Sequence, residues 1–357
     1  MYELKNKISN VSTYKVKRDN KFIAYKDTKG FKEKSIYVNN KKIEKSSITG
    51  FSFYNKYLYF SDWNKDVFKL NLDDFSIDYL NNYEQVSELS NEDFLILTKN
   101  TEKAIIFFKN KDIEISQQYI TFKSLLTKEF LFSELQNKMQ TYSLTTPQTP
   151  QWQFDLSQLG TFYSEQSQQQ EAYKVEKFIG IHQDRLYVAL NGGMLLEIDI
   201  ATGELTHRWQ NIMTTDRGFS YPVEPNTFTM DKQLGKMVSF YTSDFITIDL
   251  ASKKVNITPL DEELNKFDGM TFRPTPDDYA IDATHIYTIV TLNAPEEDFI
   301  KQSIVAFNKQ TKKIDWHYTD NQFSVDSSSP KIAGNKLYQK VNVSNLYIFE
   351  KTNDENI

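Results

Sequence analysis

The amino-acid sequence predicts an all-β protein built from repeated units. Short runs rich in Phe, Tyr, Ile and Val recur along the whole chain, and these residue types favour strands. Turn residues separate the runs. The whole pattern repeats about every 35 to 55 residues, which is typical of a radial or solenoid array. A doubly wound α/β protein would need helices between the strands, and the longest helical-looking segment is only 157–177. The all-β interpretation is therefore favoured.

The clearest unit runs from Leu186 to Trp209. It contains two short β runs separated by Gly192 and Gly193, which we expect to form a hairpin turn. A second turn follows at Thr202 and Gly203, before the strand that ends in Trp209.

Eight units can be aligned by their first apolar run, and seven is the alternative number. The runs begin near Phe22, Tyr57, Phe94, Phe130, Leu186, Met237, Ile286 and Leu337. A second apolar run follows in most units, and in four of them the turn after it has Asn71, Asp199, Asp249 or Asn308 in the same relative place. A residue with a short polar side chain stands three positions later, at Asp74, Thr202, Ser252 and Thr311. Such side chains stabilise tight turns through local backbone hydrogen bonds.

The last unit ends without a final strand. We expect residues 1–8, which precede the first unit, to supply it, so that the ring closes and leaves no exposed sheet edge. Residues 1–357 are then one domain.

The unit resembles the repeat of quinoprotein-type (PQQ-like) and WD40-like β-propellers. The quinoprotein-type repeat has an Asp, two residues, Thr-Gly, and then a Trp that docks between blades. Asp199, Thr202, Gly203 and Trp209 fit it best, while Asn308 and Trp316 fit with Lys312 in place of the glycine. The resemblance covers about 178–350 and implies a single propeller of four-stranded antiparallel blades.

The resemblance does not extend to the quinone-enzyme site. Many quinoprotein dehydrogenases carry a vicinal disulfide and a calcium site, and this chain has no cysteine and no recognisable calcium cluster. The four histidines, His182, His207, His285 and His317, form no metal-binding pair, and no Gly-x-Ser-x-Gly motif occurs. We therefore expect no cofactor, no metal and no enzymatic activity.

Composition indicates where the protein acts. The longest apolar run, Ala104–Phe108, is far shorter than a membrane span, and no signal-like segment follows Met1. We expect a cytoplasmic protein that does not contact a membrane. Residues 1–45 carry 13 Lys or Arg against 5 acids, but these bases alternate with apolar residues, as on the outward face of strands.

The long connections indicate a binding surface. By topology 154–174, 210–226, 259–278 and 293–301 emerge on one face, and together they hold 14 acids and 5 bases, a net charge of −9. Aromatic and Arg residues within acidic loops are typical of protein-binding anchors. The candidate partner-binding residues are Phe162, Tyr163, Arg217, Phe219, Tyr221, Asp261, Glu262, Glu263, Arg273, Asp277, Asp278, Glu296, Glu297 and Asp298.

This charge favours a basic protein partner and disfavours nucleic acid. The leading hypothesis is a non-enzymatic protein-binding propeller, in its sharper form an immunity protein that neutralises a basic toxin. Two alternatives remain: an enzyme or sugar-binding protein with a site in the central funnel, and a scaffold subunit of a larger complex.

Overall fold

The computed structural model describes residues 2–27, 34–43, 47–109, 111–121, 123–216, 219–267, 270–272, 278–292, 301–319, 329–341 and 345–352. Contacts group the chain into two compact units. Unit 1 consists of Met1–Ser9, Ile179–Asp199 and Leu205–Ile357, and unit 2 of Asn10–Phe178 and Ile200–Glu204.

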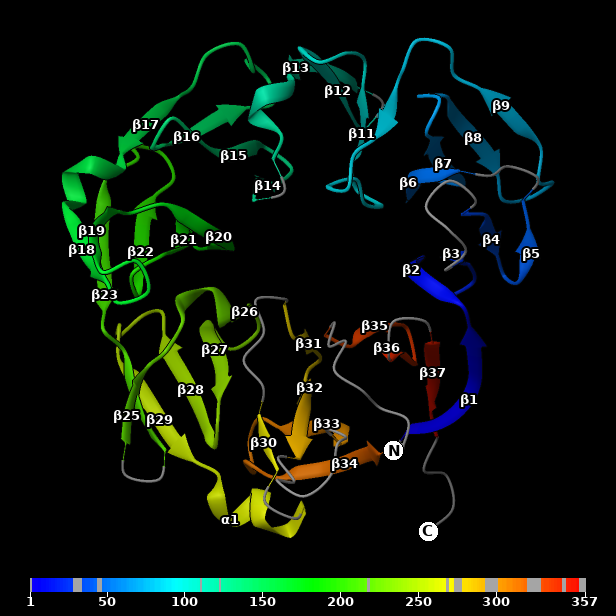
Figure 1. Cartoon of the computed structure of the whole chain (residues 1–357). Coiled ribbons are helices and arrows are strands. Elements are labelled where there is room, and N and C mark those ends of the chain that lie inside the picture. Colours follow the sequence, from blue (N-terminus) through cyan, green and yellow to red (C-terminus); the bar gives the residue numbers. More distant parts are fainter. Residues whose placement is uncertain are drawn as a thin grey trace. The chain divides into compact units, whose positions relative to one another are not determined.

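Four antiparallel sheets of four strands follow one another in unit 2 (Figure 1). The first contains β2 (Val11–Val16), β3 (Ile23–Asp27), β4 (Ile36–Val38) and β5 (Lys41–Lys42), and the second β6 (Ile48–Tyr54), β7 (Tyr57–Asp62), β8 (Val67–Asn71) and β9 (Ile77–Tyr79). The third contains β10 (Gln85–Val86), β11 (Leu95–Thr98), β12 (Lys103–Phe108) and β13 (Lys111–Ser116), and the fourth β14 (Leu125–Leu126), β15 (Phe130–Leu135), β16 (Lys138–Ser143) and β17 (Trp152–Asp155).

Four further sheets complete the chain. The fifth contains β20 (Val175–His182), β21 (Arg185–Leu190), β22 (Met194–Asp199) and β23 (Leu205–Gln210), and the sixth β26 (Thr229–Asp231), β27 (Lys236–Tyr241), β28 (Asp244–Asp249) and β29 (Val255–Pro259). The seventh contains β30 (Thr271–Phe272), β32 (His285–Leu292), β33 (Lys301–Asn308) and β34 (Ile314–Thr319), with β31 (Ala280–Ile281) also paired to β32. The eighth contains β35 (Lys331–Ala333), β36 (Lys336–Val341), β37 (Asn345–Lys351) and β1 (Tyr2–Ser9).

The remaining elements lie in the connections. They are the hairpins β18–β19 (Thr161–Ser164 and Gln169–Ala172) and β24–β25 (Met213–Asp216 and Phe219–Pro222), the helix α1 (Asp261–Leu264), and the single 3-10 turns η1 (Gln117–Tyr119), η2 (Leu156–Leu159), η3 (Pro225–Thr227) and η4 (Asn265–Phe267). No helix among the described residues is long and apolar enough to cross a membrane.

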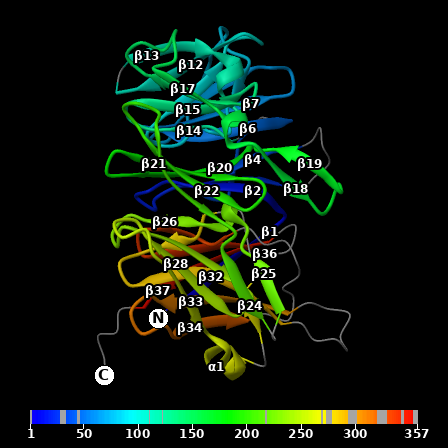
Figure 2. The same ribbon diagram turned by 90° about the vertical axis from the view of Figure 1, so that its left-hand side faces the viewer.

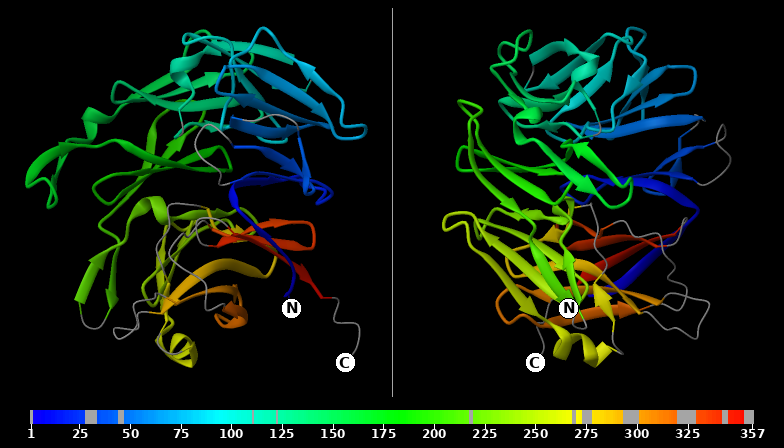
Figure 3. Two further views of the ribbon diagram at one scale, coloured as in Figure 1. Left: turned by 45° about the vertical axis from the view of Figure 1, so that its right-hand side comes forward. Right: turned by 60° about the vertical axis from the view of Figure 1, so that its left-hand side comes forward.

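The N-terminal strand completes the last sheet, as the sequence predicts. β1 pairs antiparallel with β37, from Tyr2 opposite Lys351 to Ser9 opposite Asn345, and Figure 3 shows β1 (blue) beside β37 (red). The fold is therefore an eight-bladed β-propeller of four-stranded antiparallel blades, which confirms eight blades over seven.

The eight aligned runs coincide with the second strand of each sheet, so each blade has one more strand than the sequence pattern shows. These first strands are often very short. β10 and β14 have two residues each and β26 has three, which is too few to show an alternating pattern.

The middle strands are apolar on both faces because consecutive sheets within a unit pack against each other. One cluster in unit 1 combines Tyr187, Leu195 and Trp209 of the fifth sheet with Met237 and Ile248 of the sixth. A sheet covered on both sides buries nearly every residue of its middle strands, which explains why the hydrophobic alternation in the sequence is only partial.

The turn after the third strand has the same backbone in several blades. The turn begins at the last residue of that strand, and its fifth residue has a positive φ. This fifth residue is Phe75, Gly203, Lys253 or Lys312. At Lys253 and Lys312 the N–H of this residue donates to the carbonyl of the first residue, Asp249 or Asn308. Glycine tolerates this conformation best, and Phe75, Lys253 and Lys312 adopt it at some cost in strain.

Indole groups on the outer strands bond to the next blade. Trp152 Nε1 on β17 donates to the carbonyl of Ile200 at 2.6 Å, in the turn that leads to Gly203. Trp209 Nε1 on β23 donates to the carbonyl of Lys253 at 3.0 Å, in the equivalent turn of the sixth blade. In both cases a hydrogen bond joins the tryptophan of one blade to the repeated turn of the next.

Trp316 has a related position at the last blade. Its Nε1 on β34 donates to the carbonyl of Tyr2 at 2.9 Å, so the seventh blade holds the N-terminal strand. The Trp316 ring also packs against Phe349 of β37, edge to face at 5.5 Å between ring centroids.

Candidate functional site

The β18–β19 hairpin carries two of the predicted partner-binding residues. Figure 2 shows this hairpin extending from the sheets of unit 2. Phe162 packs on Tyr173, with the ring centroids 5.2 Å apart, whereas Tyr163 is 59% exposed. Side chains alternate along a strand, so Phe162 anchors the hairpin while Tyr163 points into solvent. Of the two aromatic side chains, Tyr163 is the one available to a partner.

The β24–β25 hairpin has a similar division of roles in unit 1. Thr214 is buried and its hydroxyl donates to Asp244, which fixes the base of the hairpin. Tyr221 and Met213 remain 39% and 42% exposed. The side chain of Phe219 and the whole of Arg217 lie outside the described residues.

The three acids of helix α1 differ in their exposure to solvent. Asp261 and Glu262 are exposed, whereas Glu263 is only 9% exposed. Glu263 Oε1 accepts a hydrogen bond of 2.9 Å from the backbone N–H of Ile314, and its other oxygen is paired with Lys266. Burial opposes ionisation, but these two donors hold the pKa of Glu263 below its usual value. Glu263 therefore joins α1 to β34, and only the other two acids face solvent.

Asp278 is the remaining predicted acid within the described part of the chain. It is exposed, and its Oδ1 lies 3.5 Å from Thr229 Oγ1. The other predicted residues, Arg273, Asp277, Glu296, Glu297 and Asp298, lie outside the described residues.

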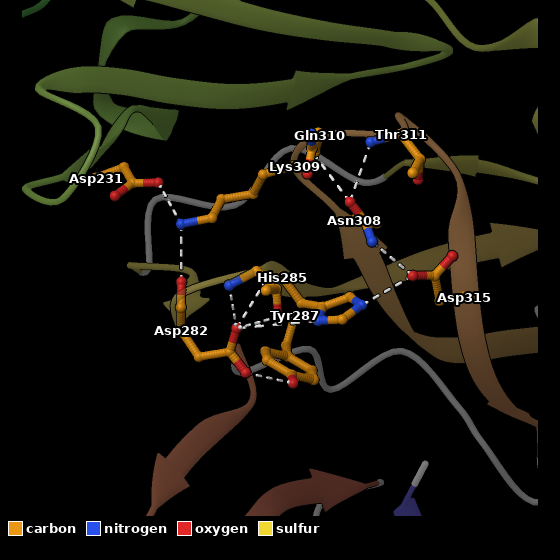
Figure 4. Close-up of polar contacts among 10 residues, drawn as sticks. Asp231, Asp282, His285, Tyr287, Asn308, Lys309, Gln310, Thr311 and Asp315 are labelled. Carbon is orange, nitrogen blue, oxygen red and sulfur yellow. Dashed lines mark hydrogen bonds and ion pairs between the residues drawn. The ribbon is translucent and has the colours of Figure 1, made fainter.

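A polar network in the seventh blade was not singled out by the sequence pattern (Figure 4). Asp282, in the turn before β32, stands at its centre. Its Oδ1 accepts from the backbone N–H groups of Thr284 and His285 at 2.8 and 2.7 Å, and its Oδ2 accepts from Tyr287 Oη at 2.8 Å. Burial alone would raise the pKa of Asp282, but these donors hold it below the usual value.

The network continues from Asp282 in two directions. His285 Nε2 lies 3.0 Å from Asp315 Oδ2, and Asn308 Nδ2 donates to the same oxygen at 2.7 Å. On the other side, Tyr287 contacts Tyr2 edge to face at 5.7 Å between ring centroids. Burial, followed by Tyr2 and Asp282, raises the pKa of Tyr287, so this phenol stays neutral and donates.

A buried ion pair lies beside the network. Lys309 Nζ contacts Asp231 Oδ2 at 2.8 Å and donates to the carbonyl of Asp282 at 2.8 Å, and the two paired side chains are 5% and 1% exposed. Asp231 belongs to the sixth blade and Lys309 to the seventh. The pair therefore fastens two blades.

His285 lies between a hydroxyl and a carboxylate, so a catalytic role for these three groups must be considered. Thr284 Oγ1 lies 2.7 Å from His285 Nδ1, while Asp315 contacts the other ring nitrogen. A nucleophilic hydroxyl must also be aimed at a substrate, and this one lies 3.3 Å from Asp282 Oδ1. The mutual bonding of these groups favours a structural role that joins turn, strand and neighbouring blade.

A second buried carboxylate fastens the fifth and sixth blades. Glu197 accepts from Thr206 Oγ1 at 2.8 Å and is paired with Lys253, whose carbonyl receives the Trp209 indole. Burial opposes its ionisation, but hydrogen bonds from Lys253, Thr206 and Tyr187 keep the pKa of Glu197 below its usual value.

Within the ranges that the structure describes, no group of three or more His, Asp or Glu side chains is arranged to hold a metal ion. Two of the other histidines make ring contacts, His207 with Trp209 at 4.5 Å and His317 with Phe267 at 5.0 Å between centroids.

Comparison with known proteins identifies the fold. No protein-family model matches the sequence, and no curated protein matches it either. Among solved structures, BamB from Moraxella catarrhalis matches with a TM-score of 0.54 at 12% identity, over 98% of this chain and 100% of that chain. Sqt1 from Saccharomyces cerevisiae matches with a TM-score of 0.58 at 9% identity, over 99% and 98%.

The computationally designed Ika8 protein is also similar, with a TM-score of 0.52 at 8% identity over 96% of each chain. Identities this low show the fold and no more. The predicted resemblance is thus confirmed at that level: the chain has the β-propeller fold shared by BamB-type (PQQ-like) and WD40-type propellers.

Proposed function

We propose that this β-propeller is a non-enzymatic protein that binds a basic protein partner through its long connections. β-Propellers commonly mediate protein binding, and loops carried on a rigid scaffold are where binding residues concentrate. The observation that carries the proposal is the exposure of Tyr163 and Tyr221 on two hairpins, one anchored by the half-buried Phe162 and the other by the buried Thr214.

Charge supports the choice of partner. In unit 1 the connection with Tyr221 and the connection with Asp261 and Glu262 both run from a fourth strand to the next first strand, so the antiparallel topology puts them at the same strand ends. An exposed aromatic ring beside acidic groups suits a partner that offers Arg or Lys, since the ring attracts the cation and the acids steer the encounter.

The test is a capture experiment with charge-reversed protein. Purified protein would be incubated with native lysate, and bound proteins identified by mass spectrometry. We expect a basic protein that is retained by the unaltered chain and lost with Asp261→Lys combined with Glu262→Lys. Asp73→Lys combined with Asp78→Lys is the matched control, because both residues are exposed acids in another part of the chain. Equal retention by all three proteins would place the interface elsewhere.

A finer form of the proposal is an immunity protein that acts in the cytoplasm against a basic toxin. It is supported by the acidic connections and by the structural use of the polar networks described above. Co-expression with the products of adjacent genes tests it. Protection of growth that depends on Asp261 and Glu262 is expected, and the absence of any protection would exclude the immunity role while leaving other protein partners open.

A further inference from the structure

The β18–β19 hairpin forms a sheet of its own, which extends from the other sheets of unit 2 (Figure 2). Within the part of the chain that the structure describes, β18 pairs with β19 alone, from Thr161 opposite Ala172 to Ser164 opposite Gln169. In an antiparallel pair, alternate residues of each strand direct their N–H and C=O groups away from the partner strand. The outer edge of β18 is therefore open to a further strand.

The two faces of the hairpin differ. Thr161 and Tyr163 project from one face of β18, because side chains alternate along a strand. Thr161 Oγ1 donates to Gln170 Oε1 at 3.0 Å, and Gln170 stands opposite Tyr163 on the same face. Phe162 projects from the other face, where it packs on Tyr173. This anchoring leaves the ring of Tyr163, which is 59% exposed, beside the open edge.

The sequence of β18 lacks the features that protect sheet edges. Charged side chains, prolines and bulges on an edge strand hinder its pairing with other chains. β18 consists of Thr, Phe, Tyr and Ser, and its register with β19 is regular. By contrast, the outer strand of each blade carries a charged side chain or a proline, namely Lys41 in β5, Asp78 in β9, Lys111 in β13, Asp155 in β17, Arg208 in β23, Pro259 in β29, Asp315 in β34 and Lys5 in β1. The open edge of β18 is thus suited to accept a strand, and the blade edges are not.

The surroundings of this edge are acidic. Glu165 follows β18 directly and is exposed. Glu171, on β19, accepts from Ser167 Oγ, and this bond is the main cause that holds the pKa of Glu171 below its usual value. No Lys or Arg occurs in 152–173, and Lys174 is the first base after the hairpin. A segment that carries Lys or Arg therefore complements the open edge in charge.

We propose that β18 is the docking edge for the basic partner, and that an extended segment of the partner, with Lys or Arg at alternate positions, joins the hairpin as its third strand. The inference rests on the proposed function, from which it takes the basic partner. Backbone hydrogen bonds to β18 hold the segment, and its side chains alternate between the two faces. A Lys or Arg on the face of Tyr163 lies next to the exposed ring, which attracts the cation.

A labelled peptide tests this with the full chain. The probe is carboxyfluorescein-labelled Lys-Val-Lys-Val-Lys-Val, and fluorescence anisotropy follows its binding. We expect saturable binding of this peptide. The same peptide with every backbone nitrogen methylated should bind at least about tenfold more weakly, since it keeps the charge but loses several hydrogen-bond donors. Equal binding of the methylated peptide would overturn strand addition.

Amide hydrogen exchange locates the peptide on the unaltered protein. The N–H groups of β18 that face away from β19 are open to water in the free protein, and binding should slow their exchange at least about tenfold. The amides of β9, an outer strand of the same unit, are the internal control and should exchange as before. Unchanged exchange in β18 would overturn the proposal, whatever the affinity of the peptide.

A pair of variants tests the contact with the aromatic ring. Tyr163→Ser should weaken binding of the basic peptide about twofold to fivefold, because the cation loses the ring. Tyr79→Ser is the matched control, since Tyr79 is 56% exposed on β9, and it should bind the peptide normally. Equal affinity of the two variants would place the peptide elsewhere and overturn the proposal.

These results are distinguishable from a failure of the proposed function. If capture of a basic protein depends on Asp261 and Glu262 but no peptide binds at up to about 1 mM, the proposed function holds and strand addition at β18 is wrong. Peptide binding at β18 without capture of any basic protein would support strand addition and count against the proposed function alone.

Discussion

The indole ring of Trp152 lies directly over Gly203, so close that a Cβ atom at Gly203 would approach the ring to 2.6 Å. The same indole donates to the carbonyl of Ile200 in this turn. Two features therefore require glycine at this position: the positive φ of 75°, and the tryptophan of the preceding blade, which leaves no space for a Cβ atom.

Replacement of Gly203 by alanine should destabilise the protein more than the equivalent change at Gly193. Both glycines have a φ of 75°, but a Cβ at Gly193 meets only Asn211 Oδ1, at 3.9 Å. Gly193→Ala should cost about 1–2 kcal/mol for its left-handed backbone. Gly203→Ala should cost a further 1–3 kcal/mol, approximately, because it overpacks against Trp152. Urea unfolding measures both, and equal losses would show that the ring moves away freely.

Removal of the Trp209 side chain should lower stability by about 3–5 kcal/mol, since it empties a large buried site between two blades. Trp209→Phe keeps much of the packing but leaves the carbonyl of Lys253 without its donor, at a cost of about 1–3 kcal/mol. Trp316→Ala should cost less than Trp209→Ala because its ring is only half-buried. Thermal and urea unfolding provide the values. An unchanged melting temperature in Trp209→Ala would contradict its role in joining blades.

The buried pair of Lys309 and Asp231 should show strong coupling. Lys309→Met leaves the Asp231 carboxylate buried without its cation and should cost about 3–5 kcal/mol. Asp231→Asn in the same chain removes that charge, and its Oδ1 still accepts from the N–H groups of Gln233 and Leu234. The double variant should therefore recover part of the loss. A double-mutant cycle in urea tests this, and simple additivity of the two losses would show that the ion pair is not coupled.

Acid should weaken the contact between the fifth and sixth blades through Glu197. Its pKa in the folded protein lies below 4.5, its value in the unfolded chain, so ionised Glu197 stabilises the fold above about pH 4.5. This contribution is lost as the pH falls through the folded pKa. Glu197→Gln should thus show a smaller decrease in unfolding free energy between about pH 7 and pH 3 than the unaltered protein. Parallel pH profiles would assign the acid sensitivity to other carboxylates.

The sequence predicted the architecture because the features that define a blade are local. The turn residues Asp199 to Gly203, and the runs on either side, follow from backbone preferences that a single sequence displays. The closing role of the N-terminal strand followed from counting strands. The first strands β10, β14 and β26 escaped detection because two or three residues carry too little pattern.

The side-chain partners were less accessible to prediction. Asp231 and Lys309 are 78 residues apart, and their pairing depends on the packing of two blades. Glu263 looked like its neighbours in the acidic run of α1, yet burial separates it from them.

The pairing of β1 with β37 has a consequence for synthesis of the protein. Of the propeller strands, β1 is synthesised first and its partner β37 last. Until these two strands meet, the edges of β1 and β37 are unpaired and exposed to pairing with other chains. The blades in between can form in order as they emerge, so completion of the eighth blade should be the last folding step and the one most sensitive to crowding by neighbouring nascent chains.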